Sequence, residues 1–216
     1  MNIHRRSILS MGAALLVSPL ISKNVVAATV LTPRQTAGPF YPSELPIDDD
    51  ADLTRVAGQP HQAEGEITDL SGRVLDARGN AIRDAHIEIW QCDANGRYLH
   101  PGDRGGLPRD PGFQGHGRAQ VSTDGSFAFR TIRPVAYPGR TPHIHVAVFT
   151  PGNEPFVTQL YIAGDPQNQG DFLFNRIPDR QKPLVELDLQ GSQLEGVQFN
   201  TSVDIILAGE NGTPSA

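Results

Sequence analysis

The sequence predicts an all-β protein, a β-sandwich of mainly antiparallel strands with long loops. Short runs such as HIHVAVF at 143–149 combine β-branched and aromatic residues with alternating faces, as half-buried strands do. No stretch shows sustained helical periodicity. The 22 glycines and 18 prolines among 216 residues supply the frequent tight turns that such a fold requires.

The first 28 residues have the features of an export signal. Arg5 and Arg6 precede an apolar run from Ile8 to Ile21, and small residues at 26–28 follow as an expected cleavage site. The apolar run is shorter than the ~20 residues that a membrane span needs, which favours a cleaved signal over a stable anchor. The adjacent arginines are typical of a twin-arginine signal, so we expect export, with the periplasm as the location.

The remaining elements follow in order along the chain. Residues 29–64 are rich in proline and not periodic, which predicts an extended N-terminal arm lying against the body. Residues 65–210 form the predicted sandwich domain, and 211–216 a flexible tail. The strand-like runs cover 64–70, 72–92 with a turn at 78–80, 118–132 with a turn at 124–125, 143–150, 156–164, 184–190 and 197–207.

Composition excludes several classes of function. The formal net charge is −6 and the basic residues are scattered, which argues against a nucleic-acid partner. Cys92 is the sole cysteine, so the chain cannot form an internal disulfide, and packing or a metal has to stabilise the fold. We interpret Cys92, next to a strand-like run, as a small residue at the edge of the core and not as a nucleophile.

The chemically informative pattern is His143 and His145, one residue apart in a predicted strand. Side chains alternate across a strand, so both imidazoles share a face about 7 Å apart at the backbone, a spacing that suits adjacent positions on one metal. Tyr137 precedes them by six residues, and Pro138 and Gly139 predict a bend that folds its phenol back toward the imidazoles.

Several segments together resemble the intradiol ring-cleaving dioxygenases, in particular the iron-bearing (beta) subunits of the protocatechuate 3,4-dioxygenases. The matching segments are LTPRQTAGPFYP, IEIWQCDANGRY, DGSFAFRTIRP (a predicted hairpin), AYPGRTPHIHVAV and TQLYIAGDP, within residues 31–209. The loop between Tyr137 and His143 is shorter than in the best-known members, so the resemblance does not assign protocatechuate itself as the substrate.

The resemblance implies a non-haem Fe(III) centre held by Tyr98, Tyr137, His143 and His145. Ferric iron prefers anionic oxygen, which two phenolates supply, whereas zinc more often recruits cysteine, histidine or carboxylate. The implied reaction opens a catechol with O2 between its two hydroxylated carbons to give a cis,cis-muconate. Tyr137 would act as a base toward the diol.

The resemblance also gives roles to two further side chains. Arg140 would stabilise negative charge that develops on the ring and steer an anionic substrate. Gln159 matches a glutamine that supports the metal ligands in the family. The implied partners are a small catechol and O2, and the sequence leaves open a homo-oligomer.

Other polar residues have simpler interpretations. His86 and Glu88 alternate with Trp90, and a half-exposed sheet face accounts for them. His100 and His116 flank a glycine-rich loop, where we expect solvent-exposed histidines. Tyr41 is expected to pack beside the pocket.

Two other functions remain open at this level. An exported, metal-free β-sandwich binding module similar to transthyretin would explain the strand pattern of 72–90 but would not need the four ligand candidates together. A zinc or copper site on the two histidines would leave the tyrosines unexplained.

Overall fold

The computed structural model describes residues 29–46 and 48–209. The predicted export signal at 1–28 and the predicted tail at 211–216 lie outside the described residues. Among the residues that are described, no helix is both long and apolar enough to pass through a bilayer.

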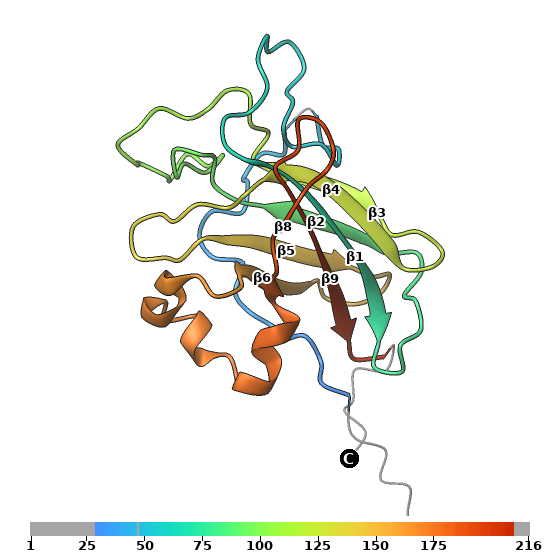
Figure 1. The fold of residues 1–216 in the computed structure, drawn as a ribbon. Helices are drawn as coiled ribbons and strands as arrows, with labels where there is room; N and C mark the ends of the chain where they lie inside the picture. The colour runs from blue at the N-terminus through green and yellow to red at the C-terminus, as the bar shows by residue number, and fades with distance from the viewer. Residues whose placement is uncertain (1–28, 47, 210–216) are drawn as a thin grey trace, which may run out of the picture.

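Two β-sheets pack face to face, which confirms the all-β sandwich (Figure 1). The first sheet contains, in spatial order, β4 (Ser126–Ile132), β1 (Ile67–Asp76), β9 (Phe199–Leu207) and β8 (Gln190–Gly191). The second contains β3 (His116–Gln120), β2 (His86–Trp90), β5 (His143–Phe149), β6 (Phe156–Ile162) and β7 (Glu186–Leu187). In the described part of the chain, five of the seven strand pairings are antiparallel, and β1–β9 and β6–β7 are parallel.

The core lies between the sheets, and β5 shows how the sequence builds it. Ile144, Val146 and Val148 point inward and are at most 1% exposed. His143 and His145 occupy the opposite face, where Ala147 packs in a second apolar cluster with Trp90 and Tyr98. One strand therefore contributes both to the core and to a buried polar site on the outside of the sheet.

The turns at 78–80 and 124–125 form, but the strands that flank them do not pair as hairpins. The predicted strand at 64–70 and the part of the predicted run 72–92 that precedes its turn form one strand, β1, which pairs with β4 and β9. After a single bridge between Leu75 and Ala81, the chain crosses to β2 in the other sheet. The turn at 124–125 likewise joins β3 to β4 across the sandwich, so the predicted hairpin at this turn is wrong. Two apolar sheet faces can be buried only against each other, which favours such crossings.

Three short 3-10 helices between β6 and β7 have no counterpart in the sequence analysis. They are η1 (Pro166–Gly170), η2 (Phe174–Arg176) and η3 (Asp179–Leu184), and they lie beside β6 in Figure 1. Helices this short leave no periodic signal. The predicted strand at 184–190 is correspondingly divided into β7 and β8.

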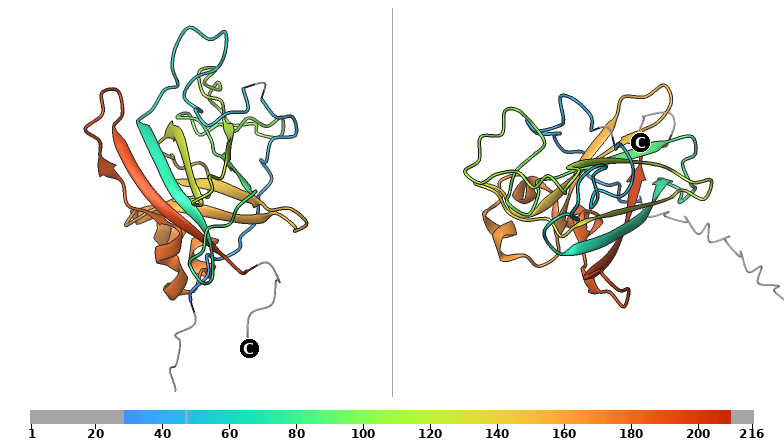
Figure 2. Two further views of the ribbon diagram at one scale, coloured as in Figure 1. Left: turned by 90° about the vertical axis from the view of Figure 1, so that its right-hand side faces the viewer. Right: turned by 90° about the horizontal axis from the view of Figure 1, so that it is seen from above.

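The segment before β1 begins beside β9 of the first sheet and continues onto β6 and β2 of the second sheet (Figure 2). The backbone nitrogen of Thr32 donates to the carbonyl of Ile206, and that of Gln35 donates to the carbonyl of Val157. Further along, the Tyr41 hydroxyl donates to Glu88 at 2.7 Å. These contacts place residues 36–41 beside His145, since a Cβ added at Gly38 would lie 3.3 Å from Cε1 of that histidine.

Candidate metal centre

His143 and His145 stand at the start of β5, and their imidazoles converge. Their Nε2 atoms are 3.2 Å apart, and the residues are 1% and 2% exposed. Nδ1 of His143 lies 2.7 Å from the carbonyl oxygen of Thr141. Because a carbonyl oxygen can only accept a hydrogen bond, we infer that Nδ1 carries the proton and that Nε2 has a lone pair. Both histidines therefore present Nε2 to the same small volume.

The bend after Tyr137 forms as the sequence indicates. Gly139 has a φ of 84°, in the left-handed region that favours glycine, and the backbone nitrogen of Arg140 donates to the carbonyl of Tyr137 at 2.9 Å. The Tyr137 ring consequently lies 5.5 Å from the His143 ring and 5.4 Å from the Tyr98 ring, measured between centroids.

Tyr98 reaches the same volume from the turn after β2. Its hydroxyl oxygen is 3.4 Å from Nε2 of His143, and the residue is 2% exposed. Asp103 holds its backbone by accepting a hydrogen bond from the Tyr98 nitrogen at 2.6 Å. The structure thus brings together all four residues that the sequence analysis suggested as ligands: Tyr98, Tyr137, His143 and His145.

Burial sets the protonation of this cluster. Desolvation, then the nearby Arg140 charge, lowers the pKa of His143 to about 4, and burial holds the pKa of His145 well below its usual range. Both imidazoles are therefore neutral at pH 7, which is the form that binds metals. Desolvation raises the pKa of both Tyr98 and Tyr137, so a strongly Lewis-acidic cation is required to bind them as phenolates.

The donor set fits a ferric ion. Two phenol oxygens, once ionised by the metal, and two neutral imidazole nitrogens combine hard anionic oxygen with nitrogen ligands. Within residues 29–46 and 48–209, no group of three or more His, Cys, Asp or Glu side chains is arranged to hold a metal. The candidate centre therefore includes the tyrosines.

Trp90 packs against the back of the centre. Its ring is stacked on His145, with centroids 4.8 Å apart and planes 6° apart, and Tyr41 contacts it edge-on at 5.0 Å. The β2–β5 register places Trp90 directly opposite His145. Sequence reasoning assigned Trp90 no role beyond its place in the strand.

Glu88 and His116 differ from their predicted surroundings. Glu88 is 1% exposed and His116 is fully buried, so neither the half-exposed sheet face nor the solvent-exposed loop histidine is correct. His116 begins β3, and the arm covers both residues. Burial alone would raise the pKa of Glu88, but hydrogen bonds from His116, Tyr41 and Arg118 outweigh it and lower this pKa to about 2.

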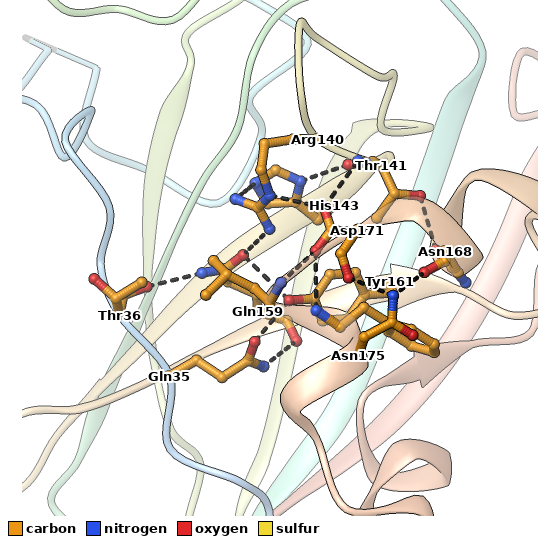
Figure 3. Close-up of polar contacts among 12 residues, drawn as sticks. Gln35, Thr36, Arg140, Thr141, His143, Gln159, Tyr161, Asn168, Asp171 and Asn175 are labelled. Atoms are coloured by element: carbon orange, nitrogen blue, oxygen red, sulfur yellow. Dashed lines mark hydrogen bonds and ion pairs between the residues drawn. The ribbon is translucent and has the colours of Figure 1, made fainter.

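Arg140 enters the site from the bend and is held on several sides (Figure 3). Its Nε donates to Asp171 at 2.8 Å, and one terminal nitrogen donates to Oε1 of Gln159 at 2.6 Å. The other terminal nitrogen is 3.4 Å from Nε2 of His143. The Arg140 side chain is 9% exposed, so it belongs to the site and is not a surface arginine.

Gln159 is a buried link between the arm and Arg140. Besides accepting from Arg140, it donates through Nε2 to the carbonyl of Thr36 at 2.9 Å. The Tyr161 hydroxyl, 3.3 Å from Oε1 of Gln159, donates to Gln35 at 2.6 Å. Asp171, which completes this network, was missed because an aspartate in an irregular segment carries no distinguishing pattern.

The remaining candidates lie at the edge of the site. His100 is half-buried and, with Tyr98, lines a cavity of about 700 Å³. The lining of this cavity includes neither Tyr41 nor His116. This cavity touches neither histidine ligand candidate nor Arg140, so we do not assign it to the reacting ring. Cys92 is 1% exposed, and burial raises its pKa to about 12, which fits a packing role.

Comparison with protein families gives a match over most of the chain. A family model described as "Dioxygenase" matches residues 36–209. The protocatechuate 3,4-dioxygenase beta chain of Burkholderia cepacia is 36% identical over 191 residues, which cover 84% of this chain and 81% of that protein. The alpha chain of the same enzyme from Pseudomonas putida is 29% identical, covering 84% of this chain and 94% of that protein.

Solved structures show the same fold. The dioxygenase domain of a carbohydrate-binding fusion protein from Streptomyces sp. SirexAA-E superposes with a TM-score of 0.63 at 29% identity, covering 83% of this chain and 99% of that one. An intradiol ring-cleavage dioxygenase from Tetranychus urticae superposes with a TM-score of 0.62 at 21% identity, covering 83% of this chain and 95% of that one.

Proposed function

This chain belongs to the intradiol ring-cleavage dioxygenase family, and from that premise we propose how its centre carries out the family reaction. A catechol-type substrate is opened with O2 between its two hydroxylated carbons to give a cis,cis-muconate. The observation that carries the proposal is the convergence of two phenols and two neutral imidazoles in one buried volume on the outer face of β5.

Four residues would hold the iron: Tyr98, Tyr137, His143 and His145. The rigid strand fixes the two imidazoles, and Thr141 fixes the tautomer of His143. The turn after β2 and the bend before β5 bring the two phenols. Bound ferric iron would supply Lewis acidity, keeping the tyrosines as phenolates, chelating the diol and activating its ring toward dioxygen.

The protein's own groups then account for protons and charge. Tyr137, the less buried of the two tyrosines, accepts a proton from a substrate hydroxyl at its phenolate oxygen. Arg140 donates hydrogen bonds toward the negative charge that develops on the ring, and Gln159 holds the guanidinium in place. Phe40 stacks on Tyr98 at 4.9 Å and limits water access from the arm side.

The centre can be tested by its colour. Iron-loaded protein should absorb visible light through tyrosinate-to-iron charge transfer, consume O2 with a panel of catechols and release ring-opened dicarboxylates. His145→Ala and Tyr137→Phe should lose iron or the visible band. Loss of a residue that only hydrogen-bonds to a metal ligand typically lowers activity roughly 10- to 100-fold. His145→Ala removes a ligand candidate itself, so its activity should fall by more than this.

His61→Ala is a matched control because the His61 side chain is 51% exposed and pairs with Asp110, which is not one of the four candidate ligands. It should retain both colour and activity. A colourless protein without oxygen uptake would instead favour a metal-free binding module. A product cleaved outside the diol would contradict the intradiol assignment.

We also propose that the protein acts after export. The twin-arginine motif at Arg5–Arg6 supports this location, since that route carries folded proteins with their cofactors in place. Such an enzyme would meet catechols in the periplasm. The sequence also left a homo-oligomer open, and light scattering on the purified protein would test for one directly.

A further inference from the structure

Asp171 is a buried carboxylate whose two oxygens have separate partners. Oδ1 accepts hydrogen bonds from the backbone nitrogens of Leu173 and Phe174, both at 2.9 Å, and so closes the turn into η2. Oδ2 accepts from Nε of Arg140 at 2.8 Å and from the backbone nitrogen of Thr141 at 3.1 Å. The Asp171 side chain is fully buried. Figure 3 shows it beneath Arg140.

The donors of Arg140 are divided among three directions. Nε is committed to Asp171 and one terminal nitrogen to Gln159, so the plane of the guanidinium is fixed from two sides. The remaining terminal nitrogen faces Nε2 of His143. If that lone pair binds the iron, this nitrogen is left as the donor that faces a bound substrate.

We propose that Asp171 is a positioning residue: its Oδ2 holds Arg140 so that the free terminal nitrogen points at the anionic ring of the bound catechol. The inference rests on the proposed function of the centre. The family resemblance gave roles to Arg140 and Gln159, whereas this role for Asp171 comes from the contacts of the structure. Without the Asp171 carboxylate, the bonds of the Arg140 side chain can rotate more freely. The free terminal N–H of Arg140 then no longer points at the bound substrate.

Two other roles for Asp171 lead to different expectations. If the carboxylate mattered through its charge, its removal would leave Arg140 uncompensated and an anionic ligand would bind more tightly. If it acted through Thr141, whose carbonyl contacts His143, its removal would disturb iron binding. Only a positioning role predicts weaker binding of an anionic catechol at unchanged iron content.

The variant that separates these roles is Asp171→Asn in the iron-loaded full chain. An asparagine retains one oxygen for the turn nitrogens of Leu173 and Phe174 but turns an NH2 group toward Nε of Arg140, where two donors cannot bond. We expect the variant to bind a nitro-substituted catechol about 10- to 100-fold more weakly than the wild type does. Anaerobic titrations that follow the visible absorbance of the nitrocatechol would measure this affinity. Iron content and the visible band of the free enzyme should not change.

Asp165→Asn is the matched control. Asp165 lies in the same segment and caps η1 by accepting from the backbone nitrogen of Gln167 at 2.9 Å, but it has no contact with Arg140. This control should bind the nitro-substituted catechol as the wild type does. In an Arg140→Met background, Asp171→Asn should have no additional effect, because the side chain through which it acts is gone.

Unchanged or tighter nitrocatechol binding in Asp171→Asn would overturn the proposal, as would loss of iron or an undiminished effect in the Arg140→Met background. If Asp171→Asn does not fold, Asp171→Glu replaces it. That variant retains the charge but shifts the carboxylate by one methylene, and it should also weaken binding; unchanged affinity would overturn the proposal. A wild-type protein that binds no iron would instead contradict the proposed function.

Discussion

At the scale of single residues, the centre depends on the alternation of side chains along one strand. In β5, every second residue faces the core, and the intervening positions carry the two histidines. A one-residue slip of β5 against β2 or β6 would move the imidazoles into the apolar core, so the buried face fixes the register of the ligands. The packing of Ile144 and Val146 thus positions His143 and His145.

Gly38 is a second residue on which the centre depends. Its φ is 69°, and a Cβ added there would lie 3.3 Å from Cε1 of His145. We expect Gly38→Ala to destabilise the fold by about 1–2 kcal/mol through its left-handed backbone, and also to weaken iron binding by pressing on the imidazole.

Gly58→Ala separates these two effects. Gly58 has a similar φ of 81°, but an added Cβ meets nothing within 4 Å. Both variants should lower the melting temperature, whereas only Gly38→Ala should reduce iron affinity in a chelator competition. Equal iron affinity in the two variants would show that the arm does not press on His145.

At the scale of elements, a buried charge cluster attaches the arm to the second sheet. Glu88 on β2 accepts from Tyr41 of the arm and from Arg118 on β3, and it lies 3.3 Å from Nε2 of His116. Nδ1 of His116 lies 3.2 Å from a carboxylate oxygen of Asp49, a second arm residue. Tyr41 also packs on Trp90, and Trp90 stacks on His145. This charge cluster therefore supports the residues that cover the metal centre.

Glu88 should make this attachment sensitive to acid. Its pKa is lowered to about 2 from an ordinary 4.5, so its stabilising contribution is complete above pH 4.5 and is lost as the pH falls through about 2. The difference in melting temperature between wild type and Glu88→Gln should therefore be largest near neutral pH and shrink between pH 4.5 and pH 2.

An exposed glutamate provides the comparison. Glu195→Gln should melt close to the wild type at every pH, since Glu195 is exposed on a loop. A constant difference between wild type and Glu88→Gln down to pH 2 would mean that the carboxylate of Glu88 does not stabilise the fold through its charge.

At the scale of the whole molecule, the first and last strands of the sandwich lie side by side. β1 and β9 pair in parallel over nine residues, and the arm hydrogen-bonds to Ile206 on β9. The arm therefore runs from β9 to the residues that cover the metal centre. It connects the first and last strands of the domain to this site.

The export proposal also concerns the whole chain. Replacing Arg5 and Arg6 by lysines preserves the positive charge but removes the arginine pair, so the protein should be retained in the cytoplasm. Cell fractionation with a cytoplasmic marker would measure this. Undiminished periplasmic protein from the double-lysine variant would contradict twin-arginine export.

The sequence by itself determined the fold class and three of the four candidate ligands, and its resemblance to a known family added the fourth. Alternation over 143–149 and a bend at Pro138–Gly139 are local properties, and they place Tyr137, His143 and His145 relative to one another over only nine residues. Tyr98 is separated from them by about forty residues, and only the resemblance of its segment to known dioxygenases pointed to it.

Only the tertiary structure decided which partners surround those ligands. Asp171, Glu88 and His116 act through contacts between residues far apart in the chain, and the burial of each depends on whether the arm or an irregular turn covers it. Near the turns at 78–80 and 124–125, the chain crosses from one sheet to the other. These crossings likewise depend on how the apolar faces of the two sheets pack against each other. Local patterns specify which way a side chain points, whereas burial and pairing are properties of the packed whole.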